Sequence, residues 1–194
     1  MFLNVKNLIK SYSKSKSIIK KLDFSVKKGE IISFIGESGS GKTTFLKCLA
    51  GLESTDSGLI ELNGRVLNDK NIFVNANERK IGFVFQDNPL FPHLNVIENI
   101  KFNLTSFNQS EFSQILKLTG LNGLEKRFPH ELSGGEKQRA CIARSLIRKP
   151  DLLLLDEPFS NLDSNIKTKI REETSRIIKE SGINTIFLNH DIAD

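Results

Sequence analysis

Residues 31–46 read IISFIGESGSGKTTFL, and this stretch decides the fold class. An apolar run at 31–35 leads into the complete pattern G-x-x-x-x-G-K-[ST] at 36–43, and an apolar helical pattern then runs from Lys42 to Gly51. Glycines let successive backbone N–H groups turn toward phosphate oxygens, and the following helix adds its positive N-terminal end. A strand–loop–helix setting supports a phosphate site. The alternative, a glycine turn with an incidental lysine, is disfavoured because so full a pattern rarely arises by chance.

The polar groups of this loop have separate expected roles. Lys42 supplies a positive charge to the β- and γ-phosphates of a nucleotide, and Thr43 offers its hydroxyl to Mg²⁺. The predicted phosphate-binding residues are Gly36, Glu37, Ser38, Gly39, Ser40, Gly41, Lys42, Thr43 and Thr44.

A second stretch, LLLLDE at residues 152–157, supplies the carboxylates that such a site needs. The four leucines predict a buried strand, and ligands bind at the carboxyl ends of strands in open α/β sheets. Asp156 is therefore expected to bind Mg²⁺, largely through water. Glu157 is expected to polarise the attacking water as a general base.

Composition is that of an ordinary soluble domain. The 194 residues carry a net charge of +5, which fits nucleic acid or an anionic membrane surface, but the lysines are scattered, so a generally basic surface is the better interpretation. No apolar run approaches the ~18 residues of a spanning helix, and the N-terminus lacks a secretion signal. We expect a cytosolic protein that meets a membrane only through partners. Cys48 and Cys141 are expected to be buried free thiols.

The pattern along the chain predicts a wound α/β core with a helical insertion. Strands are expected at 2–9, 18–27, 31–35, 81–85, 152–155 and 183–188, with a hairpin over 58–67 that turns at Asn63-Gly64. Helices are expected at 42–50, 95–104, 110–119, 134–148 and 164–181. The run at 31–35 is apolar on both faces, as in a buried central strand. One domain is therefore predicted, with its core at about 1–87 and 149–194 and a helical subdomain at about 88–148.

Residues 132–139 read LSGGEKQR, and this stretch resembles the signature motif of ABC ATPases. Tyr12 matches the aromatic residue that stacks on adenine, Gln86 matches the Q-loop glutamine at the end of a core strand, SNLD at 160–163 matches the D-loop, and His190 matches the switch histidine. The motifs follow the order of that family through nearly the whole chain. The resemblance implies an α/β fold, a P-loop NTPase (ABC ATPase) core with an antiparallel β subdomain and a helical insertion.

The family resemblance also implies a mechanism in which two cassettes close head to tail around two ATP molecules. Ser133, Gly134 and Gly135 would then cap the γ-phosphate held by the opposite chain, and Asp163 would cross the interface. His190 would hydrogen-bond the γ-phosphate and orient Glu157. The implied catalytic residues are Glu157, His190 and Gln86, the implied metal-binding residues are Thr43, Gln86 and Asp156, and the cofactors are ATP and Mg²⁺.

Each of these assignments has a structural alternative. Tyr12 can simply pack on a strand, Gln86 can be an ordinary polar residue at a strand end, and His190 can be a surface histidine. Asp163 can serve as a helix cap in either case.

Residues 77–104 resemble the importer cassettes that serve ferric iron, polyamines, sulfate, molybdate and sugars. In that group the stretch after the glutamine meets the coupling helix of a membrane subunit. Exposed side chains of Phe91 and Leu94 would suit that surface, although the Phe91 segment can instead pack against the helical insertion. The implied partners are a second cassette in a homodimer or pseudo-dimer, transmembrane permease subunits and a solute-binding protein, with no nucleic acid. The implied location is the cytoplasmic face of the cell membrane, and ferric iron is the favoured cargo.

The chain ends four residues after His190, whereas relatives in this group continue further, so no C-terminal regulatory domain is expected within it. A non-transport ABC ATPase, such as one in a cell-division membrane complex, remains an alternative function. A P-loop kinase or GTPase would leave the LSGGEKQR and SNLD stretches unexplained.

Overall fold

The computed structural model describes residues 1–13, 16–37, 39–160 and 164–189. The strands are β1 (Leu3–Ser13), β2 (Lys16–Val26), β3 (Ile31–Ile35), β4 (Ser57–Leu62), β5 (Arg65–Asn68), β6 (Ile81–Val84), β7 (Leu152–Leu155) and β8 (Asn184–Asn189). The helices are α1 (Lys42–Ala50), α2 (Val96–Lys101), α3 (Gln109–Thr119), α4 (Gly134–Leu146) and α5 (Ser164–Ser181), with 3-10 turns at Ala76–Glu78 and Pro129–Glu131.

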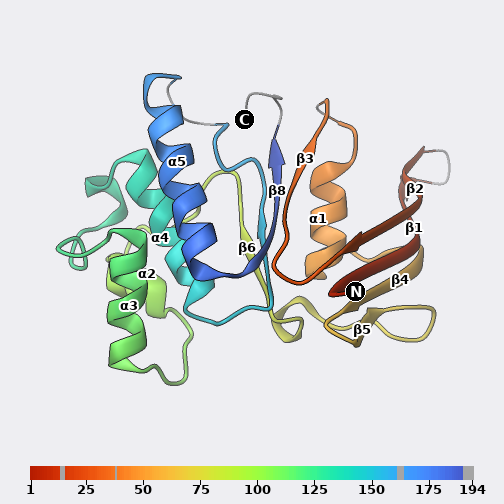
Figure 1. Ribbon diagram of the computed structural model, residues 1–194, viewed down its shortest axis with the longest axis horizontal. Coiled ribbons are helices and arrows are strands. Elements are labelled where there is room, and N and C mark those ends of the chain that lie inside the picture. The colour runs from red at the N-terminus through yellow and green to blue at the C-terminus, as the bar shows by residue number, and fades with distance from the viewer. Residues whose placement is uncertain (14–15, 38, 161–163, 190–194) are drawn as a thin grey trace.

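Two sheets organise these elements (Figure 1). One is antiparallel with the order β2-β1-β4-β5, and the other is parallel with the order β3-β8-β7-β6. Parallel strands bring their carboxyl ends to one edge of a sheet. The segments that follow β3, β6 and β7 therefore leave the sheet at the same edge, and these segments carry the predicted phosphate loop, Gln86 and the Asp156-Glu157 pair.

Strand β7 is buried on both faces, which explains its run of four leucines. Leu152 and Leu154 pack in one cluster with α1 and the antiparallel sheet. Leu153 and Leu155 pack in another cluster with α4 and α5. Figure 1 shows α1 between the two sheets and the other helices beyond the parallel sheet. A parallel sheet covered on both faces needs apolar side chains at successive positions, so the usual alternation is lost.

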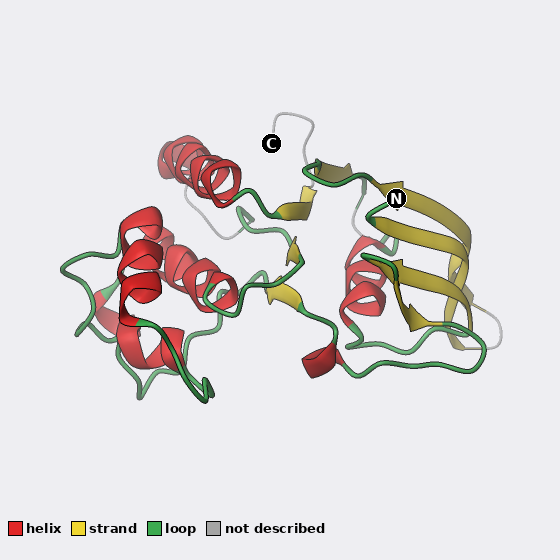
Figure 2. Cartoon of the chain, turned by 60° about the horizontal axis from the view of Figure 1, so that its bottom comes forward, coloured by secondary structure: helices red, strands yellow, loops and turns green. Residues whose placement is uncertain are grey.

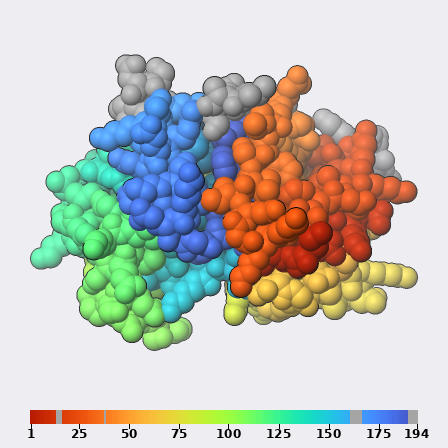
Figure 3. Space-filling view, viewed as in Figure 1, coloured from red at the N-terminus to blue at the C-terminus, as the bar shows by residue number. Residues whose placement is uncertain are grey.

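The prediction of a buried central strand at 31–35 is wrong. Strand β3 lies at one end of the parallel sheet, where it pairs with β8. Ile31 and Ile35 are 40% and 48% exposed, and Figure 3 shows the β3 region, in orange, at the surface beside the blue α5 region. The side chains of an apolar strand do not indicate whether one or both of its edges are paired, because pairing uses backbone groups.

The other helices and strands predicted from the sequence are present, with shifts at their ends. The hairpin turn lies at Asn63 and Gly64 with φ values of 51° and 79°, the positive values that a two-residue hairpin favours. The helix expected at 95–104 is shorter, because Asn95 caps its start and the backbone leaves helical geometry at Phe102. Within the described ranges, no helix has the length and apolar character required to cross a membrane.

Helices α2, α3 and α4 pack around an apolar cluster of their own. Its buried members include Ile100 of α2, Phe112 of α3 and Ala143 of α4. A partly buried Leu90 packs against this cluster and also against the cluster that Leu153 and Leu155 form with α4 and α5. The helical part is thus attached to the parallel sheet through shared apolar contacts.

Arg79 fixes the far end of α1. Its side chain is 1% exposed, and its Nη1 atom donates to the carbonyl oxygens of Cys48 and Leu49 at 2.8 and 2.9 Å. These carbonyls belong to the last turn of α1, whose acceptors have no partner within the helix. Burial lowers the pKa of the Arg79 guanidinium to about 10, and at neutral pH it stays charged and bonded. The end of α1 that lies away from the phosphate loop is therefore held in place. The thiols of Cys48 and Cys141 are free and buried, as the sequence predicts.

Candidate active site

The phosphate loop joins β3 to α1 and turns through two glycines with positive φ. Gly39 has φ +81° and Gly41 has φ +93°, values that side chains rarely allow. At Gly41 an added Cβ would also lie 2.8 Å from the Cγ2 atom of Ile18, so the loop packs directly against β2. Ser38 lies outside the described residues. The loop therefore has the backbone freedom that N–H groups converging on a phosphate require.

The ammonium of Lys42 lies over this loop. Its Nζ atom donates to the carbonyl oxygens of Gly36 and Glu37 at 2.5 and 2.8 Å, and to the hydroxyl of Ser40 at 3.3 Å. Lysine presents a compact charge with three donors on a flexible stem. The same donors can therefore turn to phosphate oxygens without a change in the loop.

Thr43 and Asp156 join the two halves of the site. The Thr43 hydroxyl donates to Asp156 Oδ1 at 2.9 Å, across a sequence separation of 113 residues. Asp156 is 6% exposed. Burial raises the pKa of its carboxyl, and the hydrogen bond from Thr43 acts in the opposite direction. A buried carboxylate is costly unless a positive charge offsets it.

The donor set fits Mg²⁺. A hydroxyl and a carboxylate are oxygen ligands, and Mg²⁺ in phosphoryl-transfer sites is held by one or two protein groups together with substrate phosphates. Among the described residues, no group of three or more His, Cys, Asp and Glu side chains could hold a metal by itself. Thr43 and Asp156 would supply two oxygen ligands, and nucleotide phosphates and water would supply the others.

Glu157 and Gln86 follow neighbouring strands at the same edge. Glu157 comes two residues after the end of β7 and has φ +47°, an unusual value for a residue with a Cβ. Such conformations gather at functional sites. The family resemblance predicts Gln86 at the end of a strand, but β6 ends at Val84 and Gln86 lies two residues further on, in a turn. His190 and Asp163 lie outside the described residues.

Tyr12 stands beside the phosphate loop. The residue is 58% exposed, and its hydroxyl is 3.4 Å from the hydroxyl of Thr44. An aromatic ring so exposed has a free surface on which a planar base can stack.

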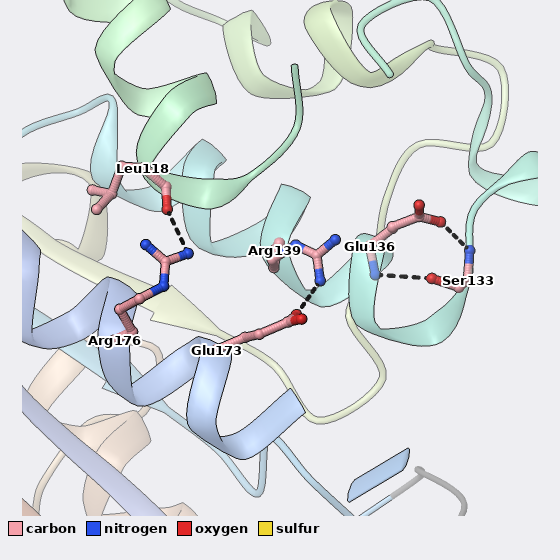
Figure 4. Close-up of polar contacts among 6 residues, drawn as sticks. All are labelled: Leu118, Ser133, Glu136, Arg139, Glu173 and Arg176. Carbon is pink, nitrogen blue, oxygen red and sulfur yellow. Dashed lines mark hydrogen bonds and ion pairs between the residues drawn. The ribbon is translucent and has the colours of Figure 1, made fainter. Parts of the chain in front are cut away.

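Ser133 caps the start of α4 in a reciprocal arrangement with Glu136 (Figure 4). The Ser133 hydroxyl accepts from the Glu136 N–H at 3.3 Å, and the Ser133 N–H donates to the Glu136 carboxylate at 2.7 Å. The hydroxyl still has its own proton to donate. At Gly135 an added Cβ would lie 2.9 Å from the Cδ1 atom of Ile170, so this glycine allows α4 to approach α5 closely. An ion pair between Arg139 and Glu173 also links the two helices.

A family model described as ABC transporter matches residues 19–160. The chain belongs to the ABC transporter family. Its fold is that of an ABC ATPase cassette. It aligns over 98% of its length with the structure of cbiO1 from Clostridium perfringens, part of the transporter complex cbiONQ, with a TM-score of 0.85, 29% identity and coverage of 79% of that chain. It also aligns over 98% of its length with the ATP-binding cassette MJ0796, a dimer in a post-hydrolysis state bound to ADP and Pi, with a TM-score of 0.79, 30% identity and coverage of 89% of that chain.

Several importer subunits resemble the cassette in sequence. The Fe(3+) ions import ATP-binding protein FbpC 2 of Haemophilus influenzae is 42% identical over 97% of this chain and 54% of its own length. The spermidine/putrescine import ATP-binding protein PotA of Mesoplasma florum is 40% identical over 97% of this chain and 54% of its own length. The chain thus spans little more than half the length of these relatives. The resemblance to importer cassettes predicted from the motifs is confirmed.

The structure brings some of the predicted site residues together and keeps others apart. Thr43 meets Asp156, and Tyr12 meets Thr44. Helix α4, whose N-cap is Ser133, packs on the opposite face of the parallel sheet from α1. Figure 2 shows helices on both sides of the parallel strands. Sequence reasoning missed the reciprocal cap at Glu136, although the Ser-x-x-Glu spacing before a helical pattern is its known signal.

The Glu136 cap predicts a measurable dependence of stability on pH. Hydrogen bonds from Ser133, above all from its backbone, hold the pKa of Glu136 below its ordinary value of 4.5. A depressed pKa stabilises the fold fully above that ordinary value, and the contribution is lost as the pH falls through the lower value of the folded state. We expect Glu136→Gln to lower the free energy of unfolding by about 0.3 to 1 kcal/mol at pH 7 and low ionic strength.

Denaturant unfolding at a series of pH values checks this expectation. The difference between wild type and Glu136→Gln should shrink steadily below pH 4.5. Glu172→Gln, at an exposed position within α5, serves as the control and should show no such trend. A Glu136→Gln difference that stays constant with pH would contradict the role of the charged carboxylate.

Proposed function

We propose that the cassette binds ATP at residues 36–44 and hydrolyses it to ADP and phosphate with Glu157 as the general base. The observation that carries this proposal is the hydrogen bond between Thr43 and Asp156, because it joins the phosphate loop to the carboxylate needed for a metal. The adenine base would stack on Tyr12. The loop N–H groups and Lys42 would hold the phosphates.

Thr43 and Asp156 would hold Mg²⁺, with Gln86 touching the metal or its water. When bound, this ion would supply positive charge that offsets the negative charge of the phosphates. Glu157 would accept a proton from the attacking water, and His190 would hydrogen-bond the γ-phosphate. Lys42 would stabilise the charge that develops on the transferred phosphate oxygens.

We propose that two copies close head to tail, so that Ser133, Gly134 and Gly135 of one copy cap the phosphates held by the other. The N-terminal end of α4 offers unpaired N–H groups and the positive end of a helix dipole. This end lies on the opposite side of the parallel sheet from α1. A second copy would therefore supply the groups that cover the phosphates bound by the first. The dimeric form of the similar MJ0796 cassette supports this arrangement.

A groove beside β6 supports a membrane-coupling role. It has a volume of about 430 Å³, and its lining includes Phe85, Phe102, Arg144 and Arg148. Phe85 and Phe102 are 39% and 44% exposed. Phe91 is half-buried rather than exposed, since its ring packs at a tilt against that of Phe102, with the ring centroids 4.2 Å apart. We propose that the coupling helix of a transmembrane permease subunit docks here.

The expectation that Phe91 and Leu94 are exposed is therefore wrong, because Leu94 is also half-buried. Asn99, fully buried, accepts from the Phe91 N–H at 2.8 Å and donates to the Leu94 carbonyl at 2.8 Å. This side chain fastens the loop to α2, so the loop packs against the helical part. Phe91 still lines the groove, but the more exposed aromatic side chains, Phe85 and Phe102, lie on either side of the loop.

We propose 1–87 with 149–194 as the nucleotide-binding core and about 88–148 as the helical subdomain. The proposed permease groove lies at their boundary, since Phe85 of the core and Phe102 of the helical subdomain both line it.

Recovery of the cassette with its membrane partner tests the transport function. Wild type is expected to co-purify from detergent-solubilised membranes with a polytopic subunit. Phe102→Glu is expected to lower that recovery at least about tenfold by placing a charge in the groove, while ATP hydrolysis by the isolated cassette continues. Phe107→Glu is the matched control, because Phe107 is 43% exposed and lies outside the groove lining.

The identity of the recovered subunit decides between two functions. A permease together with a solute-binding protein would support an importer at the cytoplasmic face of the membrane. A division-complex subunit alone would establish the alternative function. Equal recovery of the Phe102→Glu variant would overturn the docking site.

Ferric iron is the cargo we propose for the importer. The support is sequence similarity, since iron-import relatives of Haemophilus influenzae and Pseudomonas fluorescens are 42% and 45% identical. Relatives named for sulfate and polyamine import are 39% and 40% identical. Uptake of Fe³⁺ by the intact complex in vesicles, compared with spermidine and sulfate, tests the choice. Uptake of either competitor in place of iron would overturn it.

A further inference from the structure

Lys10 is a buried cation in the antiparallel sheet, next to Tyr12. The residue is 7% exposed, and its ammonium is 3.4 Å from a carboxylate oxygen of Glu53. The same ammonium lies 5.1 Å from the centroid of the Tyr12 ring. Lysine is almost never fully buried unless it is paired. Here the charge has two partners, one anionic and one aromatic.

The ring of Tyr12 is held at two points. In the β1–β2 ladder, Ser11 pairs with Ser17 and Ser13 pairs with Lys16, so Tyr12 is an extra residue in β1. A bulge of this kind redirects a side chain. The hydroxyl of the ring lies near Thr44, and the ammonium of Lys10 lies over the ring. The ring is nevertheless 58% exposed, which leaves surface for a stacked base.

We propose that Lys10 is a positioning residue for the adenine base, acting through Tyr12; this inference rests on the proposed ATP site. A cation over an aromatic face is attracted by the electrons of the ring and so restrains the plane of the ring. A ring that is already restrained loses less freedom when a base stacks on it, so binding is tighter. The ion pair with Glu53 holds the ammonium against the face of the ring. Lys10 itself does not touch the nucleotide.

The contribution of Lys10 to nucleotide affinity should depend on the adenine base and not on the phosphates. Titration calorimetry with ATP and with inorganic tripolyphosphate, which lacks the base, separates these two contributions. We expect Lys10→Met to weaken ATP binding about 3- to 10-fold, and to leave tripolyphosphate binding unchanged. Lys10→Arg should restore most of the ATP affinity, since it keeps the cation. Lys6→Met is the matched control, because Lys6 lies exposed on the same strand.

Two further measurements distinguish positioning from a structural ion pair. In a Tyr12→Ala background, Lys10→Met should cause no additional loss of ATP affinity. Tyr12 is the one tyrosine in a chain without tryptophan, so tyrosine fluorescence reports on this ring alone. ATP should change that fluorescence in wild type, and tripolyphosphate should not.

The results distinguish failure of the proposed role of Lys10 from failure of the proposed ATP site. Equal weakening of ATP and tripolyphosphate binding by Lys10→Met, or a loss that persists in the Tyr12→Ala background, would overturn the role of Lys10. Lys10→Gln, a neutral side chain that can still hydrogen-bond to Glu53, carries the same test if thermal melting shows that Lys10→Met does not fold. Wild type that fails to bind ATP would overturn the proposed function itself, and this inference with it.

Discussion

Glu157→Gln is expected to lower the rate of ATP hydrolysis about 10²- to 10⁴-fold while ATP binding persists. Glutamine keeps the shape of the side chain but cannot accept a proton from water. The strained backbone at this residue, with φ +47°, is unchanged by the substitution, so the site should stay assembled. Phosphate release measures hydrolysis, and equilibrium titration measures ATP binding.

A carboxylate outside the site gives the control for this prediction. Glu172→Gln, exposed on α5, should hydrolyse ATP at the wild-type rate. If Glu157→Gln hydrolyses ATP within a few-fold of wild type, another group activates the water and the assignment of the general base is wrong.

Lys42→Ala is expected to weaken ATP binding by at least about 10- to 100-fold, because a hydrogen bond to a charged group contributes roughly 1.5 to 3 kcal/mol. Hydrolysis should fall further, since the same charge acts on the transition state. The fold should persist, because the partners of Lys42 in this structure are oxygens of its own loop. Thermal melting checks the fold, and ATP titration checks the affinity.

Lys20→Ala, at an exposed position of β2, is the matched control for loss of one positive charge. It should bind ATP as wild type does. An unchanged ATP affinity in Lys42→Ala would show that the phosphates bind elsewhere on the molecule.

Most of the fold follows from local patterns that the sequence displays. The four leucines of β7 predict a strand covered on both faces, because a parallel sheet between two layers buries successive residues. The Asn63-Gly64 pair predicts its hairpin, because both residues tolerate positive φ. Such signals are carried within a few residues, so no knowledge of the tertiary structure is needed.

The missed features depend on contacts between distant segments. Whether β3 is central or at an edge depends on which strands pair with it, and its apolar residues suit both cases. Gly135 is needed because Ile170 approaches it from another helix, and no local pattern reveals that approach. Lys10 is different, because it comes two residues after the buried Leu8 on β1. Residues two apart point to the same face of a strand, so this spacing could have revealed a buried cation.

In the proposed docking surface, the exposure of the Phe91 segment likewise could not be predicted from local sequence. Sequence composition indicates an apolar surface in the region, but the side chain of Asn99 decides which aromatic residues remain exposed. Its hydrogen bonds draw Phe91 and Leu94 against α2. Phe85 and Phe102 remain the more exposed rings of the groove, which Phe91 also lines. A single buried amide, 8 residues along the chain from Phe91, therefore determines the surface offered to a partner.

The solution mass of the Glu157→Gln variant, with Mg-ATP and without nucleotide, tests the central claim most directly. Two nucleotides at a head-to-tail interface should hold this hydrolysis-deficient variant closed, so its mass should double with Mg-ATP and remain that of a monomer without it. Adding Ser133→Arg, which puts a bulky side chain at the proposed interface, should restore the monomer. A Glu157→Gln variant that binds ATP and yet keeps the monomer mass would contradict the account.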